Sequence, residues 1–237
     1  MRADLAAKQG DLSAIRGLRL SAAEGPVAAL QQMAIRAGIL PGRDFEILVN
    51  VSFGVAAARA LEAGLIDGFW ANAMGAETVV DSGAGKVLID VRRGDDPADV
   101  RHFTFAALAT TDTYLERNPA GVEAAVRAII KAQRMLRADP SLAQKIRQSK
   151  FPPDSAELIV RTIQRDVGFY DPVITEEAVA NMNAFTQTIG YLPDPVPYDQ
   201  VVDVRFRQCW THPCPISPLP PVGAIAGTHP VWGLIAR

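Results

Sequence analysis

The alternation of short apolar runs with helical patterns in the first hundred residues constrains the fold more than any other feature. Residues 17–22 form a short alternating apolar run, as in a half-buried strand, and Gly25-Pro26 then opens a helical pattern that Gly38 ends. A second strand is predicted over 45–49 and a second helix from Val55. Strands that alternate with single helices at this short spacing predict a mainly parallel sheet with helices on its faces.

The same rhythm continues as far as a charged loop. A third strand is predicted over 65–70 and a short helix over 75–80, and an apolar run over 86–91 follows. The loop over 92–97 contains two arginines, two aspartates and a proline, and it is predicted to be a boundary between two parts of the chain. The predicted fold class of this first part is therefore α/β.

The second half of the chain is predicted to be rich in helices. One more strand is expected over 103–111, and from Asn118-Pro119 onward the periodicity is helical. Residues before a proline avoid the helical region, so the Asp-Pro and Pro-Pro pairs between 139 and 172 separate these helices. The predicted helices cover residues 119–137, 142–146, 155–167 and 176–189. Residues 210–237 hold six prolines without a sustained period and are expected to be irregular.

Charge and cysteine content argue against several classes of partner. With 24 Lys and Arg against 26 Asp and Glu, the net charge of −2 gives no basic footprint for a nucleic acid or an anionic membrane surface. No apolar stretch approaches the roughly 20 residues that span a bilayer, and residues 1–16 lack the pattern of a secretory signal. The two cysteines, Cys209 and Cys214, provide neither a disulfide framework nor a four-ligand zinc pattern.

The loops that follow the three early strands are the expected place of a ligand site, because ligands of open α/β sheets bind beyond the carboxyl ends of the strands. In the first loop, Ala23, Glu24 and Gly25 lie where the free N–H groups of a helix start would suit an anionic or polar group. The Glu24 carboxylate would either cap this helix or repel an anion. A plain strand-to-helix turn is the alternative interpretation of such a loop.

The second and third loops offer aromatic faces and polar groups that are typical of pockets for small ligands. Ser52 and Phe53 lie in the second loop, and Trp70, Asn72 and Met74 lie in the third. Phe69 and Trp70 could equally belong to the core, but strand alternation places only one of them on each face. We expect Trp70 to face the crevice.

Catalytic and cofactor sites find little support in the sequence. The three histidines are far apart, and neither cysteine has a histidine and a carboxylate set around it. The Gly-x-Gly at 83–85 lacks a third glycine and reads as a turn rather than a nucleotide loop. We therefore predict no catalytic residue, metal or cofactor. The charged loop at 92–97 is predicted to be solvated, although an arginine there could reach across a cleft to a ligand carboxylate.

Several segments, in their order, resemble the type 2 periplasmic binding proteins. Residues 11–20 resemble the entry into the second lobe of that family, and residues 57–68 are similar to its Ala-Leu-x-x-Gly-x-Ile/Val-Asp pattern. Residues 114–125 look like the helix entry after the return crossing, and residues 190–202 resemble the closing segment. The closest group comprises the nitrate, sulfonate, taurine and pyrimidine-precursor (thiamine) binding proteins of ABC importers.

The resemblance implies two lobes, a small-molecule solute in the cleft between them, an ABC permease as partner and a periplasmic location. The division expected is a first crossing over 1–16, an α/β lobe two over 17–100, and a second crossing with the C-terminal helices of lobe one over 101–208. The irregular tail over 209–237 would follow. Because the family begins with a signal peptide and further strands of lobe one, we expect a fragment that is truncated at its N-terminus.

Two other functions stay open at this stage. One is an enzyme of pyrimidine-precursor (thiamine) biosynthesis on the same scaffold, which would need a cluster of His and Cys that is not visible. The other is the effector-sensing domain of a transcription regulator, which would carry a DNA-binding helix pair upstream. The ligand is not named by the sequence, but Glu24 makes a zwitterionic or aromatic solute a better expectation than nitrate or sulfate.

Overall fold

A computed structural model describes residues 1–5, 7–49, 54–70, 73–97, 107–151 and 153–212 of the 237-residue chain. Three short strands form one sheet: β1 (Arg19–Ala22), β2 (Glu46–Leu48) and β3 (Gly68–Trp70). The order is β2-β1-β3 and both pairings are parallel, with Leu20 beside Ile47 on one side and Gly68 on the other. The predicted parallel α/β arrangement is confirmed.

Helices cover both faces of this sheet. The first, α1 (Glu24–Arg36), packs on one face, where Leu20, Leu30 and Met33 belong to a buried apolar cluster. On the other face, α2 (Val55–Glu62) and α3 (Ala73–Asp81) form a second cluster with Ile66. Along β3, Trp70 packs against the first cluster and Phe69 against the second, as strand alternation predicts. We call this part of the chain, residues 1–97, the α/β lobe.

The start of the chain and the apolar run over 86–91 complete the α/β lobe without adding a strand to its sheet. The Met1 ammonium donates to the Lys86 carbonyl at 3.0 Å, and the Lys86 N–H donates to the Met1 carbonyl at 2.9 Å. The run ends in a short 3-10 helix, η2 (Val91–Arg93), whose N-cap is Asp90. Residues 1–16, expected as a crossing segment, pack on this lobe, because Leu12 and Ile15 of the 3-10 helix η1 (Leu12–Ile15) are buried in its first cluster.

The second half of the described chain is helical. The long helix α5 (Pro119–Ala138) follows α4 (Asp112–Arg117), and α6 (Leu142–Lys150), α7 (Pro153–Asp166) and α8 (Glu176–Thr188) come next. Shorter elements are η4 (Val167–Phe169), α9 (Tyr198–Val201), η5 (Val204–Phe206) and α10 (Gln208–Thr211). We call residues 107–212 the helical part. The predicted helices are confirmed to within a few residues at their ends.

Three predictions about this half and the loop before it need correction. Residues 107–111 form no strand, and the rest of the strand expected over 103–111 lies outside the described residues. Trp210, expected in an irregular tail, belongs to α10, and its neighbour Cys209 is buried and disulfide-bonded, which was not predicted. Cys214 lies outside the described residues. The charged loop is not simply solvated, because Asp96 is only 6% exposed.

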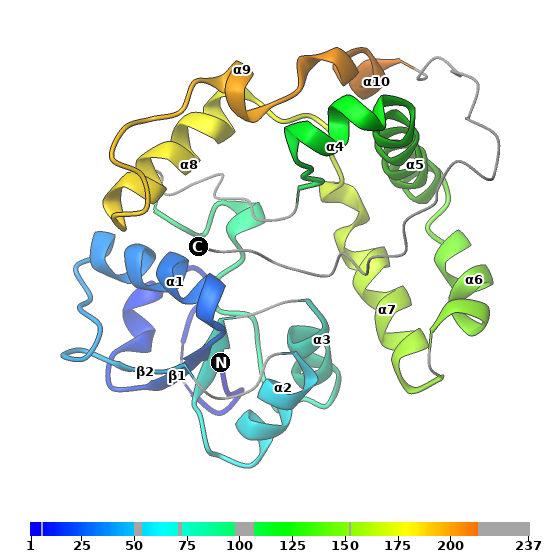
Figure 1. Cartoon of the computed structure of the whole chain (residues 1–237). Helices are drawn as coiled ribbons and strands as arrows, with labels where there is room; N and C mark the ends of the chain where they lie inside the picture. The colour runs from blue at the N-terminus through cyan, green and yellow to red at the C-terminus, as the bar shows by residue number, and fades with distance from the viewer. Residues whose placement is uncertain (6, 50–53, 71–72, 98–106, 152, 213–237) are drawn as a thin grey trace.

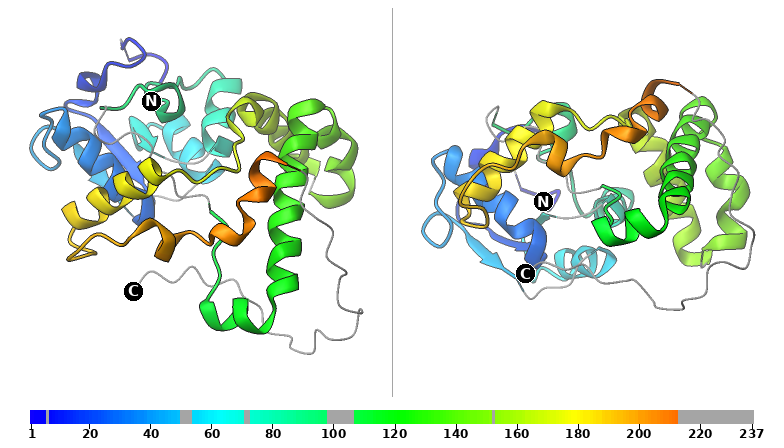
Figure 2. Two further views of the ribbon diagram at one scale, coloured as in Figure 1. Left: turned by 90° about the horizontal axis from the view of Figure 1, so that it is seen from above. Right: turned by 45° about the horizontal axis from the view of Figure 1, so that its top comes forward.

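Helices α5 and α6 lie away from the α/β lobe, α7 lies between them and α3, and α8 to α10 run across from one side to the other (Figure 1, Figure 2). The two parts meet where α7 packs against α3. None of the helices among the described residues combines the length and the apolar character that a membrane crossing requires.

Candidate functional site

The turn from β1 into α1 lies at the carboxyl edge of the sheet. The register places Ala22, the last residue of β1, beside Trp70, the last residue of β3. Ala23 is the N-cap of α1 and gives it no side-chain hydrogen bond, while Glu24 and Gly25 are exposed. Since the first turn of a helix has no intrahelical acceptor for its N–H groups, those of Glu24 and Gly25 are offered to a ligand or to water.

The start of α2 and the start of α3 are in contact through two glycines. Gly54 is the N-cap of α2 with φ +66° and ψ −130°, a conformation that glycine adopts far more readily than other residues. A Cβ atom on Gly75 would stand 2.7 Å from the Gly54 carbonyl oxygen, so the two backbones are in direct contact. This contact was not predicted from the sequence. It brings the start of α2 and the start of α3 together beside the α1 turn.

Five of the eight predicted ligand residues lie on described segments, and all five are at this edge: Ala23, Glu24, Gly25, Trp70 and Met74. Trp70 and Met74 are half-buried, and Trp70 packs partly against the core on the α1 face. Ser52, Phe53 and Asn72 lie outside the described residues. We call the end of β1 with the α1 turn, the end of β3, and the starts of α2 and α3 the ligand edge.

A buried carboxylate lies at the opposite edge of the sheet. Asp67, just before β3, accepts hydrogen bonds from the Arg19 N–H at 2.9 Å, from Arg19 Nε at 3.1 Å and from Arg2 Nη1 at 3.1 Å. The hydrogen bond from Arg19 is the largest effect on its pKa, and it holds that pKa below the ordinary value although burial acts the other way. Asp67, part of the family-like pattern at 57–68, thus joins β1 and β3 on the side away from the ligand edge.

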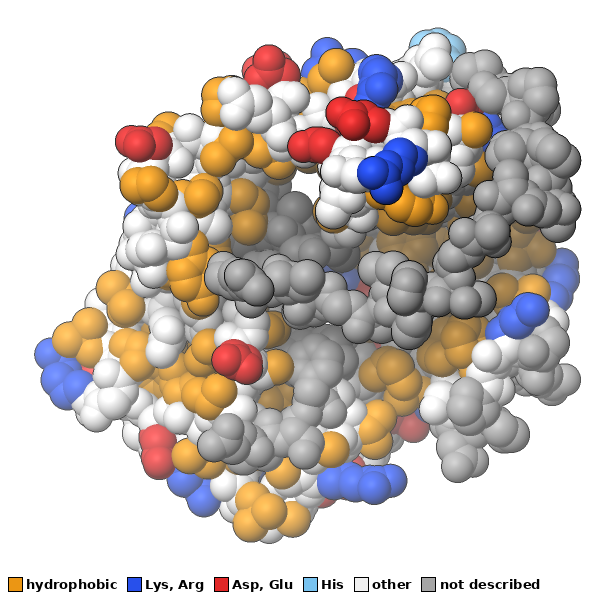
Figure 3. Space-filling model, in the orientation of Figure 1, with side chains coloured by type: hydrophobic (Ala, Val, Ile, Leu, Met, Phe, Trp, Pro, Cys, Tyr) orange, Lys and Arg blue, Asp and Glu red, His pale blue; other side chains and the backbone are white. Residues whose placement is uncertain are grey.

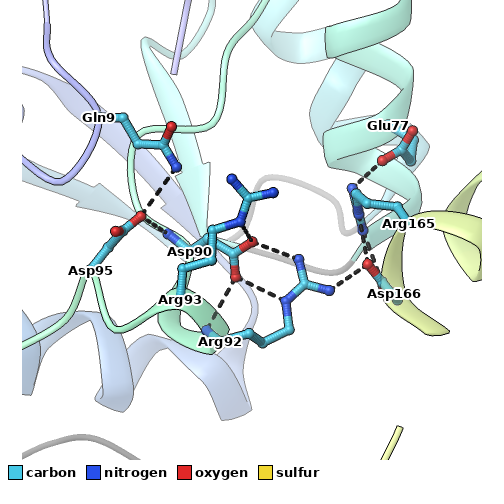
Figure 4. Close-up of polar contacts among 8 residues, drawn as sticks. All are labelled: Gln9, Glu77, Asp90, Arg92, Arg93, Asp95, Arg165 and Asp166. Atoms are coloured by element: carbon cyan, nitrogen blue, oxygen red, sulfur yellow. Dashed lines mark hydrogen bonds and ion pairs between the residues drawn. The ribbon is translucent and has the colours of Figure 1, made fainter. Parts of the chain in front are cut away.

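A chain of ion pairs joins the α/β lobe to α7 beside α3 (Figure 4). Arg92 of η2 contacts Asp90 with Nη2 at 2.8 Å and also contacts Asp166 at the end of α7. Arg165, the neighbour of Asp166, pairs with Glu77 of α3. Burial is the largest single influence on the pKa of Asp90 and of Asp166 and raises it, but the guanidinium groups outweigh it and hold both values below the ordinary one.

These contacts bear on the expectation that an arginine of the loop at 92–97 could reach across a cleft to a ligand carboxylate. An arginine of the loop at 92–97 does reach across to a carboxylate, but the carboxylate belongs to Asp166 of α7. Within the described residues there is no group of three or more His, Cys, Asp or Glu side chains placed to hold a metal ion.

Two open pockets lie elsewhere on the molecule. One, of about 550 Å³, is lined by Arg2–Asp4, Leu61–Gly64 and Gly83–Ala84, at the edge of the sheet opposite the ligand edge. The other, of about 460 Å³, lies between the end of α5, residues 170–172 and Trp210. Neither is lined by a residue of the ligand edge. The assignment of that edge therefore stands on sheet topology and on the N–H groups of the α1 turn.

Comparison with known proteins identifies the fold. No family model and no curated protein sequence matches this chain. Among solved structures, the alkanesulfonate-binding protein SsuA from Xanthomonas axonopodis pv. citri bound to MOPS is similar, with a TM-score of 0.57 at 15% sequence identity. The match covers 85% of this chain and 67% of that chain. The chain therefore has an α/β periplasmic binding fold, with one α/β lobe and a helix-rich second part.

Proposed function

We propose that this chain is the solute-binding component of an ABC importer that takes up a small organic solute. The observation that carries the proposal is that the ends of β1 and β3 lie side by side, with the starts of α2 and α3 in contact, in a fold similar to that of an alkanesulfonate-binding protein. Ligands of open α/β sheets bind at this edge. The permease of the importer would be its partner, and the periplasm its location.

The ligand edge favours a solute that carries both charges or an aromatic group. The N–H groups at the start of α1 suit a sulfonate or carboxylate, whereas the exposed Glu24 carboxylate beside them suits a cation. The half-buried Trp70 offers an aromatic face at the same edge. A simple oxyanion such as nitrate would meet the repulsion of Glu24 without using the rest of the site.

A ligand screen by thermal shift, followed by calorimetry, tests this proposal. The probes are taurine and MOPS, which each carry an amine and a sulfonate, ethanesulfonate, which lacks the amine, nitrate, and an aminopyrimidine. We expect taurine, MOPS or the aminopyrimidine to stabilise the protein more than ethanesulfonate or nitrate do. A strong preference for nitrate or ethanesulfonate would refute the charge argument, and no response to any probe would refute solute binding of this class.

The residues of the edge are tested by truncation. Trp70→Ala and Asn72→Ala should each weaken the binding of the best probe, by a few kcal/mol at most, as is usual for single contact residues. Tyr191→Ala is the matched control, because Tyr191 is a large aromatic residue in the helical part and is strongly exposed. If the affinity stays the same in both variants, Trp70 and Asn72 do not contact the ligand.

A further inference from the structure

Five side chains of alternating charge form ion pairs along the contact between the α/β lobe and α7. The series runs from Glu77 of α3 through Arg165 and Asp166 of α7 to Arg92 and Asp90 (Figure 4). Arg165 Nε lies 2.6 Å from Asp166, and both side chains also contact a partner from the α/β lobe. We call these five residues the ionic bridge. Their side chains are 9% to 31% exposed, so solvent screens them less than it screens ordinary surface pairs.

Arg92 is held in place before it reaches α7. Its Nε and Nη2 atoms each lie 2.8 Å from an oxygen of Asp90, which leaves Nη1 to contact Asp166. The guanidinium carbon also lies 4.9 Å from the centre of the Phe169 ring in η4. Because the planar fork is already oriented by Asp90, little side-chain freedom is lost when it binds α7.

The bridge lies close to the ligand edge through α3. Glu77 follows Met74 by three residues on α3, and residues with this spacing share one face of a helix. The end of α7 is therefore attached one helical turn from a predicted ligand residue. An additional pair between Arg161 of α7 and Asp81 of α3 aligns the two helices further along.

We propose that Arg92 is a positioning residue that holds α7 against the α/β lobe through Asp166 and thereby keeps the start of α3 in the geometry that binds solute. The part that concerns solute rests on the proposed function; the part that concerns α7 does not. Arg92 itself need not touch the solute. Loosening the bridge should free the end of α7 first and weaken the solute site as a consequence.

Hydrogen exchange tests the attachment of α7. Asp166→Asn keeps the shape of the side chain and removes its charge, and we expect amides of residues 156–166 to exchange about tenfold faster while those of α2 do not change. Arg92→Gln should act in the same way, and the double variant should be less impaired than the sum of the two single ones, because both remove the same contact. Unchanged exchange in α7 would overturn the proposal.

Arg127→Gln is the matched control. Arg127 pairs with Glu123 at 3.0 Å, and the two side chains are 21% and 20% exposed, close to the 31% and 16% of Arg92 and Asp166. That pair lies within one helix, α5, so its loss should leave the exchange of α7 unchanged. If Arg127→Gln accelerates exchange in α7 as much as Asp166→Asn does, the effect is a general loss of charge and the proposal fails.

Calorimetry with MOPS tests the consequence for binding. Asp166→Asn should weaken the affinity about three- to tenfold, and Arg92→Lys, which keeps the charge but not the fork, should fall between the wild type and Arg92→Gln. Faster exchange in α7 with unchanged affinity would show that the bridge is structural only and would overturn the positioning role. If the wild type binds none of the probes, the proposed function fails, while the exchange experiment still decides whether the bridge holds α7.

Discussion

The α/β lobe and the helical part both consist of regular secondary structure, but their buried side chains are arranged differently. In the α/β lobe, strands and helices share two contiguous clusters of buried apolar side chains, one on each face of the sheet. In the helical part, the described buried side chains, such as Val122, Val160 and Phe185, belong to neither cluster. Exposed large apolar side chains occur in both parts, for example Leu65 in the α/β lobe and Ile129 and Val201 in the helical part, so the difference between the parts lies in the two contiguous clusters.

The difference shows that good local signals do not by themselves make a core. The helices of the second half have ordinary start signals: Pro119 opens α5, and the hydroxyl of Thr175 accepts from the Ala178 N–H at 3.0 Å to cap α8. A helix in a protein nevertheless owes most of its stability to packing of its apolar face. Hydrophobic side chains remain visible over α8 as well as α1 on one face of the molecule (Figure 3).

The largest expected consequence is a difference in local stability between the two parts. Because protection from hydrogen exchange follows the density of buried contacts, amides of α1 and β1 should exchange at least about a hundredfold more slowly than those of α5 and α8. Limited proteolysis should leave a protected fragment that begins at the N-terminus and ends near residue 111, while the later helices are cut. If residues 1–208 are instead uniformly resistant and monomeric, the two parts share one stability and this comparison is wrong.

Two matched core variants test the same difference at single residues. Leu30 of α1 is 3% exposed and Ile130 of α5 is 4% exposed, so burial alone predicts equal effects. Leu30 lies inside a contiguous cluster of buried side chains, and Leu30→Ala should lower the free energy of unfolding by an amount near the upper end of about 2–5 kcal/mol. Ile130→Ala should cost less, near the lower end of about 2–5 kcal/mol, because Ile130 belongs to neither cluster. Urea denaturation followed by circular dichroism measures both, and equal losses would contradict the prediction.

Two glycines at the ligand edge differ in how closely they are packed: Gly75 is in tight contact with its surroundings and Gly25 is not. Gly75→Ala places a methyl group 2.7 Å from the Gly54 carbonyl oxygen and should lower the free energy of unfolding by about 1–3 kcal/mol. Gly25→Ala is the control, because nothing lies within 4 Å of its Cβ position in the first turn of α1. It should leave stability within about 0.5 kcal/mol or raise it slightly. Thermal denaturation of both variants decides whether the α2–α3 contact is as tight as described.

The elements that could be predicted from the sequence are those whose conformation depends on residues nearby in the chain. The parallel sheet, the helices of both halves and the opposite faces of Phe69 and Trp70 follow from hydrophobic periodicity and from proline and glycine positions. The same reasoning predicts that the loops after the three strands form a ligand site, and this stays a prediction. It rests on the fact that the carboxyl ends of parallel strands always lie at one edge of their sheet.

What was not predicted depends on residues that are distant in sequence. Arg92 and Asp166 are separated by 74 positions, and only the packing of α7 on α3 brings them together. The buried Asp96 and the contact of Gly54 with Gly75 depend likewise on how loops pack in three dimensions. A charged residue type indicates that a partner is needed when it is buried, but it does not indicate which residue that partner is.

The smallest expected effect concerns the Glu24 carboxylate at the proposed solute site. Glu24 is exposed in the first turn of α1, where its carboxylate opposes the attraction of the helix start for an anion. In Glu24→Gln, ethanesulfonate should bind about two- to fivefold more tightly at low salt, because a charge near a helix end is worth about 0.3–1 kcal/mol there. Taurine and MOPS should gain less or lose affinity, since their amines lose the carboxylate. Both changes should fade at high salt, where the Debye length falls to about 3 Å.

Glu62→Gln is the control for this prediction. Glu62 is an exposed carboxylate at the C-terminal end of α2, so its loss should alter neither affinity. If the preference between ethanesulfonate and taurine is the same in Glu24→Gln and in the wild type at low salt, Glu24 has no part in selecting the solute and the zwitterion argument must be abandoned.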